Sequence, residues 1–339
     1  MARVPHPTPA KPAATRNDVA RLAGVSAAVV SYVVNGSKRV SPTTETRVRE
    51  AIAMLGYRPN RAARALRLGS SETLGMVVPD STNPFFATLA HAVEQAAAER
   101  GYDLLVANSD GSVAMERRHL DNLATRQVDG VFVCSSIVEP DLRALEQADI
   151  PSVLLNQYVA APGVDSVSVD LKRGSALAVE HLAEHGHRTI GLVIGTNSDN
   201  TVDAREVGWH ETIARLGLSA GTVFRHPFSR SGGYDAGRWL LHSAVRPSAL
   251  FVGSDRQAVG VLKALHEAGV RVPEDIAIIS FDGSEDAEFS WPPLSSVAQP
   301  IDEMAHAAVT ALIDGEGEKH HLVFEPTLIR RASCGCPSA

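Results

Sequence analysis

The chain of 339 residues carries 32 Lys and Arg against 39 Asp and Glu, and 44% of its residues are hydrophobic. This length suits about two or three domains, and the composition excludes a disordered, collagen-like or small disulfide-stapled protein. The formal net charge of −7, taken alone, argues against a nucleic-acid partner.

The charge is unevenly distributed along the chain. Residues 1–70 hold 12 basic and 3 acidic residues, a net charge of +9, and the rest of the chain holds 20 and 36, a net charge of −16. A codon bias could explain why 27 of the 32 basic residues are Arg, but it does not place charge at one end. A basic head on an acidic body therefore predicts an anionic partner for the head alone.

The sequence shows no sign of export or membrane insertion. Its three cysteines, Cys134, Cys334 and Cys336, do not suggest a disulfide framework. Residues 1–14 are rich in Pro and Ala and lack the apolar core of a signal peptide, so we expect a disordered tail there. No run approaches the ~20 apolar residues of a membrane helix. We expect a cytoplasmic protein without membrane contact.

Three helices are predicted in the basic head, over residues 16–23, 26–35 and 41–55. Each begins near a residue that can cap a helix N-terminus and ends at a glycine: the caps are Thr15, Ser26 and Ser41, and the glycines are Gly24, Gly36 and Gly56. Ala20 is small where the first two helices would cross, and Gly24 follows four residues later, which is helix-turn-helix spacing. Two amphipathic helices of any small bundle would give a similar pattern, and this alternative stays open on this segment alone.

The third helix is followed by a short basic segment. The stretches NDVARLAGVSAAVVSYVVNG and VSPTTETRVREAIAMLGYRPNRAARALR resemble the DNA-binding head of the LacI/GalR (lactose-repressor) family of bacterial transcription regulators, over residues 15–68. The resemblance implies that residues 26–35 form the recognition helix in the major groove. It also implies that residues 60–67 form a hinge helix that orders on the operator.

The resemblance also gives candidate DNA contacts. They are Ser26, Ala27, Ala28, Ser31, Tyr32, Asn35, Asn60, Arg61, Arg64 and Leu66. Ala27 and Ala28 depart from the larger polar residues of better-known members and can make only apolar contacts, so polar base recognition falls mostly to Tyr32. The two serines and Asn35 are expected at phosphates. Leu66 stands where the family inserts a leucine into the minor groove, with a linker anchor on the body as its alternative.

From residue 72, short apolar runs alternate with amphipathic stretches. We expect strands at 74–78, 103–107, 130–133, 153–155, 190–194, 223–225, 249–252 and 276–281, and helices at 86–100, 115–126, 174–185, 205–215 and 256–268. Repeated βα units predict parallel sheets with helices on both faces. The strands exceed one comfortable sheet, so we expect two lobes with a ligand cleft between them.

The resemblance continues through the body. LGMVVPDSTNPFFATL, RQVDGVF, VEHLAEHGHRTIGLVIG, AREVGW and residues 276–283 are similar to the family's effector domain, whose fold is that of periplasmic sugar-binding proteins. The implied fold class is α/β, with an all-α helix-turn-helix head and hinge helix before a two-lobed domain of parallel sheets. The expected divisions are a tail at 1–14, the head at 15–59, the hinge at 60–71, the effector and dimerisation domain at 72–332 and a tail at 333–339. One lobe takes about 72–168 and 298–325, and the other about 169–297 and 326–332.

Candidate effector contacts follow from chemistry, because a sugar-like ligand needs aromatic faces and a few fixed polar groups at strand C-terminal ends. They are Asp80, Phe85, Phe86, Asn156, Arg205, Phe228, Ser254, Asp255 and Asp282, of which the resemblance makes Arg205 and Asp282 the most characteristic. Several have other interpretations. One of the two adjacent phenylalanines is expected in the core, the two aspartates after residue 250 could be helix N-caps, and Arg205 could form a local surface pair with Asp203.

Two further patterns carry less weight. His181 and His185 are four residues apart with His187 nearby, a spacing that can hold zinc, but they end an ordinary helix, where histidine suits the helix dipole. Cys334 and Cys336 are interpreted as tail thiols. We therefore predict no metal and no cofactor. No sequence motif joins a nucleophile to a base, so we predict no catalytic residue and no enzyme.

The predicted function is a sequence-specific DNA-binding transcription repressor, whose affinity for double-stranded operator DNA depends on a small, sugar-like effector bound between the lobes. The alternative is the solute-binding protein of a sugar transporter, which would leave the basic head unexplained. We expect a homodimer and not a tetramer, because the sequence leaves no room for a C-terminal heptad tail. Its interface is predicted on the helix at 86–100, along the stripe of Leu89, Ala90, Val93 and Ala97.

Overall fold

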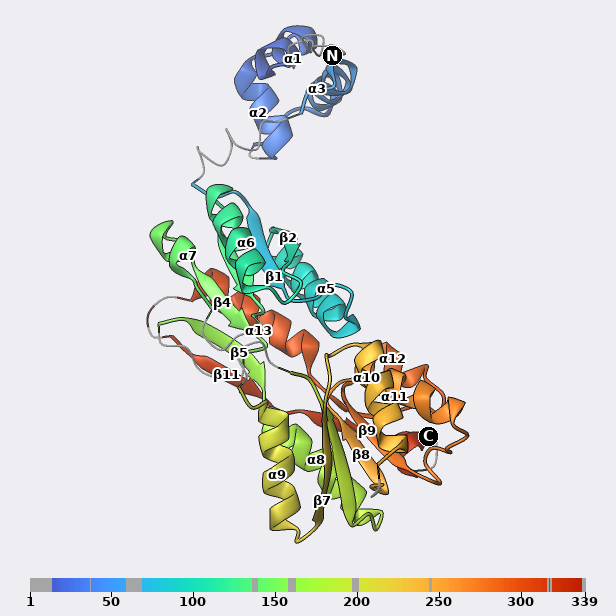
Figure 1. Ribbon diagram of the computed structural model, residues 1–339. Coiled ribbons are helices and arrows are strands. Elements are labelled where there is room, and N and C mark those ends of the chain that lie inside the picture. The colour runs from blue at the N-terminus through green and yellow to red at the C-terminus, as the bar shows by residue number, and fades with distance from the viewer. Residues whose placement is uncertain are drawn as a thin grey trace, which may run out of the picture. The chain divides into compact units, whose positions relative to one another are not determined.

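The computed structural model describes residues 14–36, 38–58, 69–135, 140–157, 163–196, 201–243, 246–315, 317 and 319–336. The chain divides into two compact units, Met1–Ser71 and Glu72–Ala339, which we call the head and the body (Figure 1). No helix in these ranges is long and apolar enough to cross a membrane.

The described part of the head consists of α1 (Arg16–Ala23), α2 (Ala27–Asn35) and α3 (Pro42–Leu55). The predicted caps are in place, since the Thr15, Ser26 and Ser41 hydroxyls each accept a hydrogen bond from a backbone N–H of the first turn. Val19, Val30 and Val48 are fully buried, one from each helix, and form a small core. The turn between α1 and α2 passes through Gly24 at φ 63°, a conformation that favours glycine. The predicted three-helix head is confirmed.

The first lobe of the body, lobe N, is built on a parallel sheet of six strands within the described residues. Their order is β11-β5-β4-β3-β1-β2, with bounds β1 (Thr73–Val78), β2 (Asp103–Asn108), β3 (Gly130–Val133), β4 (Ser152–Leu155), β5 (Asp165–Val169) and β11 (His321–Phe324). The helices of this lobe are α5 (Pro84–Glu99), α6 (Val113–Thr125), α7 (Arg143–Gln147) and α13 (Ile301–Asp314). Although α13 comes late in the chain, it packs against α5. Figure 1 shows it in orange-red among the green and cyan elements of this lobe.

The second lobe, lobe C, holds the other described sheet, of order β12-β10-β9-β8-β6-β7. Its strands are β6 (Thr189–Ile194), β7 (Ser219–Arg225), β8 (Ala249–Val252), β9 (Ala277–Asp282), β10 (Ser295–Ala298) and β12 (Thr327–Ile329). All the pairs are parallel except that of β10 with β12. The helices are α8 (Leu171–Glu184), α9 (Ala204–Arg215), α10 (Arg230–Leu241), α11 (Asp255–Glu267), α12 (Glu285–Glu288) and the 3-10 turn η1 (Ala332–Cys334).

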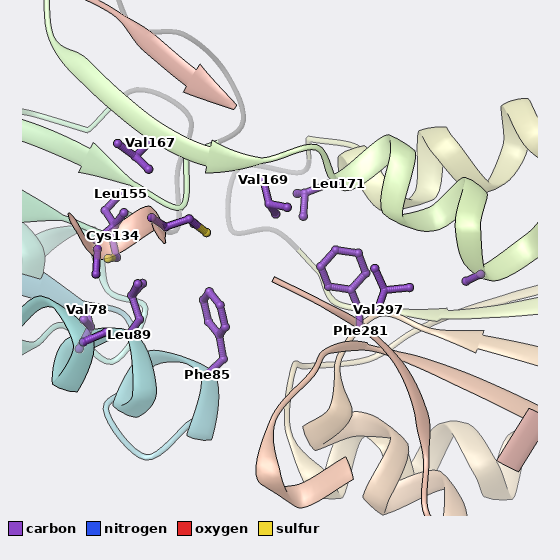
Figure 2. Close-up of a cluster of buried hydrophobic side chains, with 14 of the residues drawn as sticks. Val78, Phe85, Leu89, Cys134, Leu155, Val167, Val169, Leu171, Phe281 and Val297 are labelled. Carbon is purple, nitrogen blue, oxygen red and sulfur yellow. The ribbon is translucent and has the colours of Figure 1, made fainter. Parts of the chain in front are cut away.

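Three described segments join the lobes: β5 to α8, β10 to α13, and β11 to β12. Buried apolar side chains continue through the first of these connections. Figure 2 shows Val169 and Leu171 lying between Phe85 of lobe N and the pair Phe281 and Val297 of lobe C. The lobes therefore share one hydrophobic core at their junction, which positions the strand ends of both sheets around the same space.

Two expectations are wrong. The proposed dimer stripe on α5 is not a free surface, because Leu89, Val93 and Ala97 are fully buried in the core of lobe N. The predicted tail from residue 333 is part of lobe C up to the end of the described chain at residue 336. Ser333 and Cys334 are buried there, and the Ser333 hydroxyl donates to the Ile278 carbonyl at 2.7 Å.

Candidate functional site

One face of α2 carries the predicted DNA contacts of the head. Ala28, Ser31, Tyr32 and Asn35 follow the i, i+3, i+4, i+7 pattern of a single helix face, away from the buried Val30. All four are exposed or partly exposed, as are Ser26 and Ala27 at the start of the helix. This face can enter a groove of DNA without disturbing the core of the head.

The polar groups of this face are already organised. The Asn35 side-chain amide donates to the Ser31 hydroxyl at 3.0 Å, and the Lys38 ammonium lies 5.7 Å from the centre of the Tyr32 ring. Lys38 is not a sequence candidate, and its ammonium adds a positive charge beside this face of α2. The hinge candidates Asn60, Arg61, Arg64 and Leu66 lie outside the described residues.

A cavity of about 680 Å³ lies between the two lobes of the body. Residues of both lobes line it: Pro79, Asp80, Thr82, Asn83, Phe85, Phe86, Asp110, Gly111, Ser135, Asn156 and Gln157 from lobe N, and Leu171, Thr196, Asp203, Arg205, Pro227, Phe228, Ser254, Asp282 and Gln299 from lobe C and its connections. The volume falls in the range of small-molecule sites, and charged, amide and aromatic groups converge in it.

Arg205 is held rigidly at the cavity wall. Its guanidinium donates to both carboxylate oxygens of Asp203, at 2.9 and 2.8 Å, and to the Gly253 carbonyl at 2.8 Å. Burial would raise the pKa of Asp203, but the charge and hydrogen bonds of Arg205 hold it below its ordinary value. The two side chains are only 13% and 4% exposed, so the Arg205–Asp203 pair is local, as one alternative proposed, but it is not a surface pair.

Aromatic rings stand beside this arginine. The Arg205 guanidinium carbon lies 4.8 Å from the centre of the Phe228 ring, a cation–π arrangement. Across the cavity, Phe85 and Phe86 meet edge to face with ring centres 5.0 Å apart. Phe85 is 4% exposed and largely belongs to the core, as expected for one of the two, while Phe86 is partly exposed. The cavity thus offers an apolar face on each side.

Asp282 ends β9 in an unusual backbone conformation. Its φ of 116° is one that side-chain-bearing residues rarely adopt, and such strain is common at functional sites. Burial, and then the neighbouring charge of Asp255, raises the pKa of Asp282 well above its ordinary value. The Gln299 amide donates to Asp282 at 3.1 Å, while Gln299 Oε1 is buried and accepts no hydrogen bond from the described part of the chain. Asp282 and Gln299 together present acceptors to the cavity.

An ion pair connects the two lobes at the cavity. Asp80, after β1 of lobe N, accepts hydrogen bonds from Thr82 and from Arg256, which belongs to α11 of lobe C. Burial opposes ionisation of Asp80, but these hydrogen bonds hold its pKa below the ordinary value. The Arg256 guanidinium also donates to the Thr82 hydroxyl at 3.1 Å. Asp80 therefore contributes to contact between the lobes in addition to lining the cavity.

Asp255 is the one effector candidate that does not line the cavity. Its carboxylate is buried and accepts hydrogen bonds from the Ser280 and Ser296 hydroxyls and from the Ser284 hydroxyl and backbone N–H, at 2.5 to 2.8 Å. These contacts occupy both carboxylate oxygens of Asp255. Asp255 therefore holds the surrounding serines together, and the expectation that it contacts the effector directly is corrected. Asp255 is not a helix cap either, because Ser254 caps α11.

Sequence reasoning missed several polar cavity residues, among them Gln157, Asp110 and Gln299. Each follows the C-terminal end of a strand, so the same rule that selected Asn156 would have found them. Asp110 and Gln157 follow strands that the sequence did predict, but they were not selected. Gln299 was missed because β10 was not predicted.

Comparisons with known proteins agree with this architecture. Residues 15–60 match the family described as bacterial regulatory proteins, lacI family, and residues 179–334 match a periplasmic binding protein-like domain. The ribose operon repressor of Escherichia coli (strain K12) is 36% identical over 319 residues, covering 93% of this chain and 94% of that protein.

Solved structures show the same fold. The lac repressor dimer bound to operator and the anti-inducer ONPF superposes with a TM-score of 0.84 at 28% identity, covering 95% of this chain and 99% of that one. A LacI family transcriptional regulator from Enterococcus faecium with bound ribose superposes with a TM-score of 0.70 at 32% identity, covering 77% of this chain and 98% of that one.

Proposed function

The chain belongs to the lacI family of bacterial regulatory proteins, and from this premise we propose that it represses transcription under the control of a small ligand bound between its lobes. The observation that best supports this proposal is that one chain combines a helix-turn-helix head with an interlobe cavity lined by fixed charges and aromatic rings. The alternative, a solute-binding protein, is not favoured, because it gives the head no role. The relatives are transcriptional repressors, so we propose regulation without catalysis, in the cytoplasm where the chromosome lies.

We propose a pentose-like sugar as the effector class. Phe228 and Phe86 supply faces for the C–H surface of a sugar ring, and Arg205, Asp282 and Gln299 supply donors and acceptors for its hydroxyls. The ribose in the Enterococcus faecium regulator and the name of the Escherichia coli relative support this class. The remaining proposed contacts are Asp80, Phe85, Asn156 and Ser254.

We propose that the head binds double-stranded operator DNA through α2. Tyr32 reads base edges, and Ser26, Ser31, Asn35 and Lys38 hold phosphates, while the hinge candidates keep the roles that the family resemblance implies. The two alanines of α2 limit direct reading of bases to apolar contact at their positions.

We propose that two copies associate, so that two heads meet the halves of a near-palindromic operator, as in the lac repressor dimer. Large apolar side chains on the body support self-association. Leu105 and Val106 are 41% and 48% exposed on the edge strand β2, and Phe289 and Trp291, which follow α12, are 76% and 88% exposed. They replace the buried α5 stripe as the proposed interface.

The proposed mechanism is a population shift. Ligand binding favours one relative arrangement of the lobes, which changes the geometry across the dimer and thereby the order of the hinge segments. The Asp80–Arg256 pair stabilises the arrangement in which the lobes are in contact. The ligand shifts the equilibrium only by the difference between its affinities for the two states.

Selection of genomic fragments bound by the purified full-length protein tests the function. We expect a short palindromic sequence to be enriched and its binding to weaken steeply with salt, since phosphate contacts dominate affinity. A variant lacking residues 1–71 is the control and should lose this binding. A panel of pentoses, hexoses and nucleosides in a thermal-shift assay then tests the effector class. Enrichment of no sequence would refute the repressor, whereas stabilisation by nucleosides alone would refute only the sugar.

A further inference from the structure

Two histidines and two cysteines meet at one place in lobe C. His181 and His185 lie at the C-terminal end of α8, and Cys334 and Cys336 lie in and just after η1, about 150 residues later in the chain. Each pair alone supplies only two ligands, and nothing in the sequence places the two pairs together. The fold brings all four together, in the part of the chain that the structure describes.

The distances suit a single small cation. His181 Nε2 lies 3.4 Å from Cys334 Sγ and 3.4 Å from Cys336 Sγ, and Cys336 Sγ lies 3.4 Å from His185 Nε2. All four ligand atoms lie within 4.8 Å of one another. A tetrahedral zinc ion with bonds of about 2.3 Å to sulfur and about 2.0 Å to nitrogen separates its ligands by about 3.3–3.8 Å. Three contacts already have that spacing, and the widest pair needs to close by about 1 Å.

The surroundings support ligation and leave a way in. His181 and Cys334 are buried, whereas His185 is exposed and Cys336 is partly exposed, so an ion can enter from solvent. The Ser295 hydroxyl lies 3.0 Å from Cys334 Sγ and can donate to a thiolate there. His181 Nδ1 is buried without a hydrogen-bond partner among the described residues, and it lies 3.7 Å from the Glu184 carboxylate, too far for a hydrogen bond. Because the Glu184 side chain is 72% exposed, a small movement would let it accept from Nδ1 and orient a metal-bound imidazole.

We propose that these four side chains bind one Zn²⁺ ion. Two imidazoles and two thiolates are a ligand set that selects a tetrahedral soft-to-borderline cation, and two thiolates neutralise its charge. The ion ties the C-terminal segment of the chain to α8, whose first residue, Leu171, lines the interlobe cavity. Cys334 also contacts Ser295, which begins the strand leading to Gln299 at the same cavity. The site therefore fixes two elements that support the cavity.

A metal titration of the reduced full-length protein tests the site. After treatment with a chelator, the protein is titrated with Co²⁺ and then with Zn²⁺ in competition with a coloured chelator. We expect one ion per chain, a thiolate-to-cobalt charge-transfer band together with the visible bands of tetrahedral Co²⁺, and loss of both when Zn²⁺ displaces it. Zinc should also protect Cys336 from alkylation. Absence of binding, or cobalt spectra without a thiolate band, overturns the proposal.

Variants locate the ion. Cys336→Ser and His185→Gln change partly or fully exposed ligands, and His187→Gln changes a neighbouring histidine outside the set. We expect the first two to weaken zinc binding at least about 100-fold and to lose the zinc-dependent rise in melting temperature, and the control to keep both. Equal urea midpoints of all forms in chelator show that they fold. Affinity unchanged by Cys336→Ser or His185→Gln, or lost equally in His187→Gln, overturns the assignment.

Discussion

The buried pair Arg205–Asp203 gives the sharpest prediction, and it concerns the substitution Arg205→Ala. This change removes the guanidinium's hydrogen bonds to both Asp203 carboxylate oxygens and to the Gly253 carbonyl. The Asp203 carboxylate, 4% exposed, then keeps the backbone N–H of residue 205 as its donor from this pair. Breaking a buried ion pair by removing one partner typically costs about 3–5 kcal/mol. We therefore expect Arg205→Ala to destabilise lobe C by about that amount.

A second substitution separates this effect from lost packing. Asp203→Asn in the Arg205→Ala background removes the stranded charge while keeping an oxygen that can cap α9. We expect the double variant to recover about 2 kcal/mol of the loss. Urea unfolding followed by Trp209 fluorescence measures this, because Trp209 is fully buried in lobe C, while Trp239 and Trp291 are 67% and 88% exposed in the folded protein.

The pH dependence gives an independent check. In the wild type the pKa of Asp203 lies below its ordinary value of 3.8, so its contribution to stability is present above that value and is lost as pH falls through the lower folded pKa. Without Arg205, burial dominates and the folded pKa rises, which reverses the sign of the contribution. The stability deficit of Arg205→Ala should then shrink as pH falls. A deficit under about 1 kcal/mol, no recovery in the double variant or a deficit independent of pH would refute the reasoning.

Three further predictions concern the cavity. Burial and the charge of Asp255 raise the folded pKa of Asp282 above 3.8, so the stability from its neutral form is lost as pH rises through the folded pKa. Asp282→Asn should therefore stabilise the body at neutral pH, by an amount that vanishes toward pH 3.8. A gain that is constant with pH in urea unfolding would contradict this. In Gly195→Ala, the new Cβ overlaps the Phe228 ring, so we expect the free energy of unfolding to fall by about 1–3 kcal/mol. The ligand should also raise the melting temperature less than in the wild type. Wild-type unfolding free energy and ligand stabilisation would count against this. Asp255→Ala removes the acceptor of the Ser284 N–H and of the Ser280, Ser284 and Ser296 hydroxyls, so urea midpoints should report a loss of about 2–4 kcal/mol with unchanged ligand preference. Altered ligand preference without destabilisation would return Asp255 to the ligand site.

Local patterns predicted much of this structure. The N-caps and terminal glycines of the head could be predicted because each lies within one turn of the helix end that it defines. The rule that ligands meet strand C-terminal ends selected Arg205, Asp282 and Phe228, all of which line the cavity. These features depend on short-range geometry and on the general behaviour of parallel sheets.

Three features that the sequence did not reveal depend on contacts between distant parts of the chain. The strand β10 has the sequence SSVA, and its buried serines are stabilised by hydrogen bonds to distant groups such as the Asp255 carboxylate, which no hydrophobic pattern reveals. The α5 stripe showed the periodicity of a buried face, but sequence alone did not show whether its own core or a second copy covers it. The meeting of His181 with Cys334 depends on contact between segments about 150 residues apart.

Operator affinity measured with and without the effector is the most direct test of ligand-controlled repression. A fluorescent duplex carrying the selected sequence is titrated with full-length protein, alone and with the sugar that raises its melting temperature most. We predict a ligand-dependent change of about 5–150-fold in the dissociation constant. The variant Phe228→Ala should bind DNA normally without ligand and show little response. A sugar that stabilises the protein through this cavity yet leaves operator affinity unchanged would contradict the account.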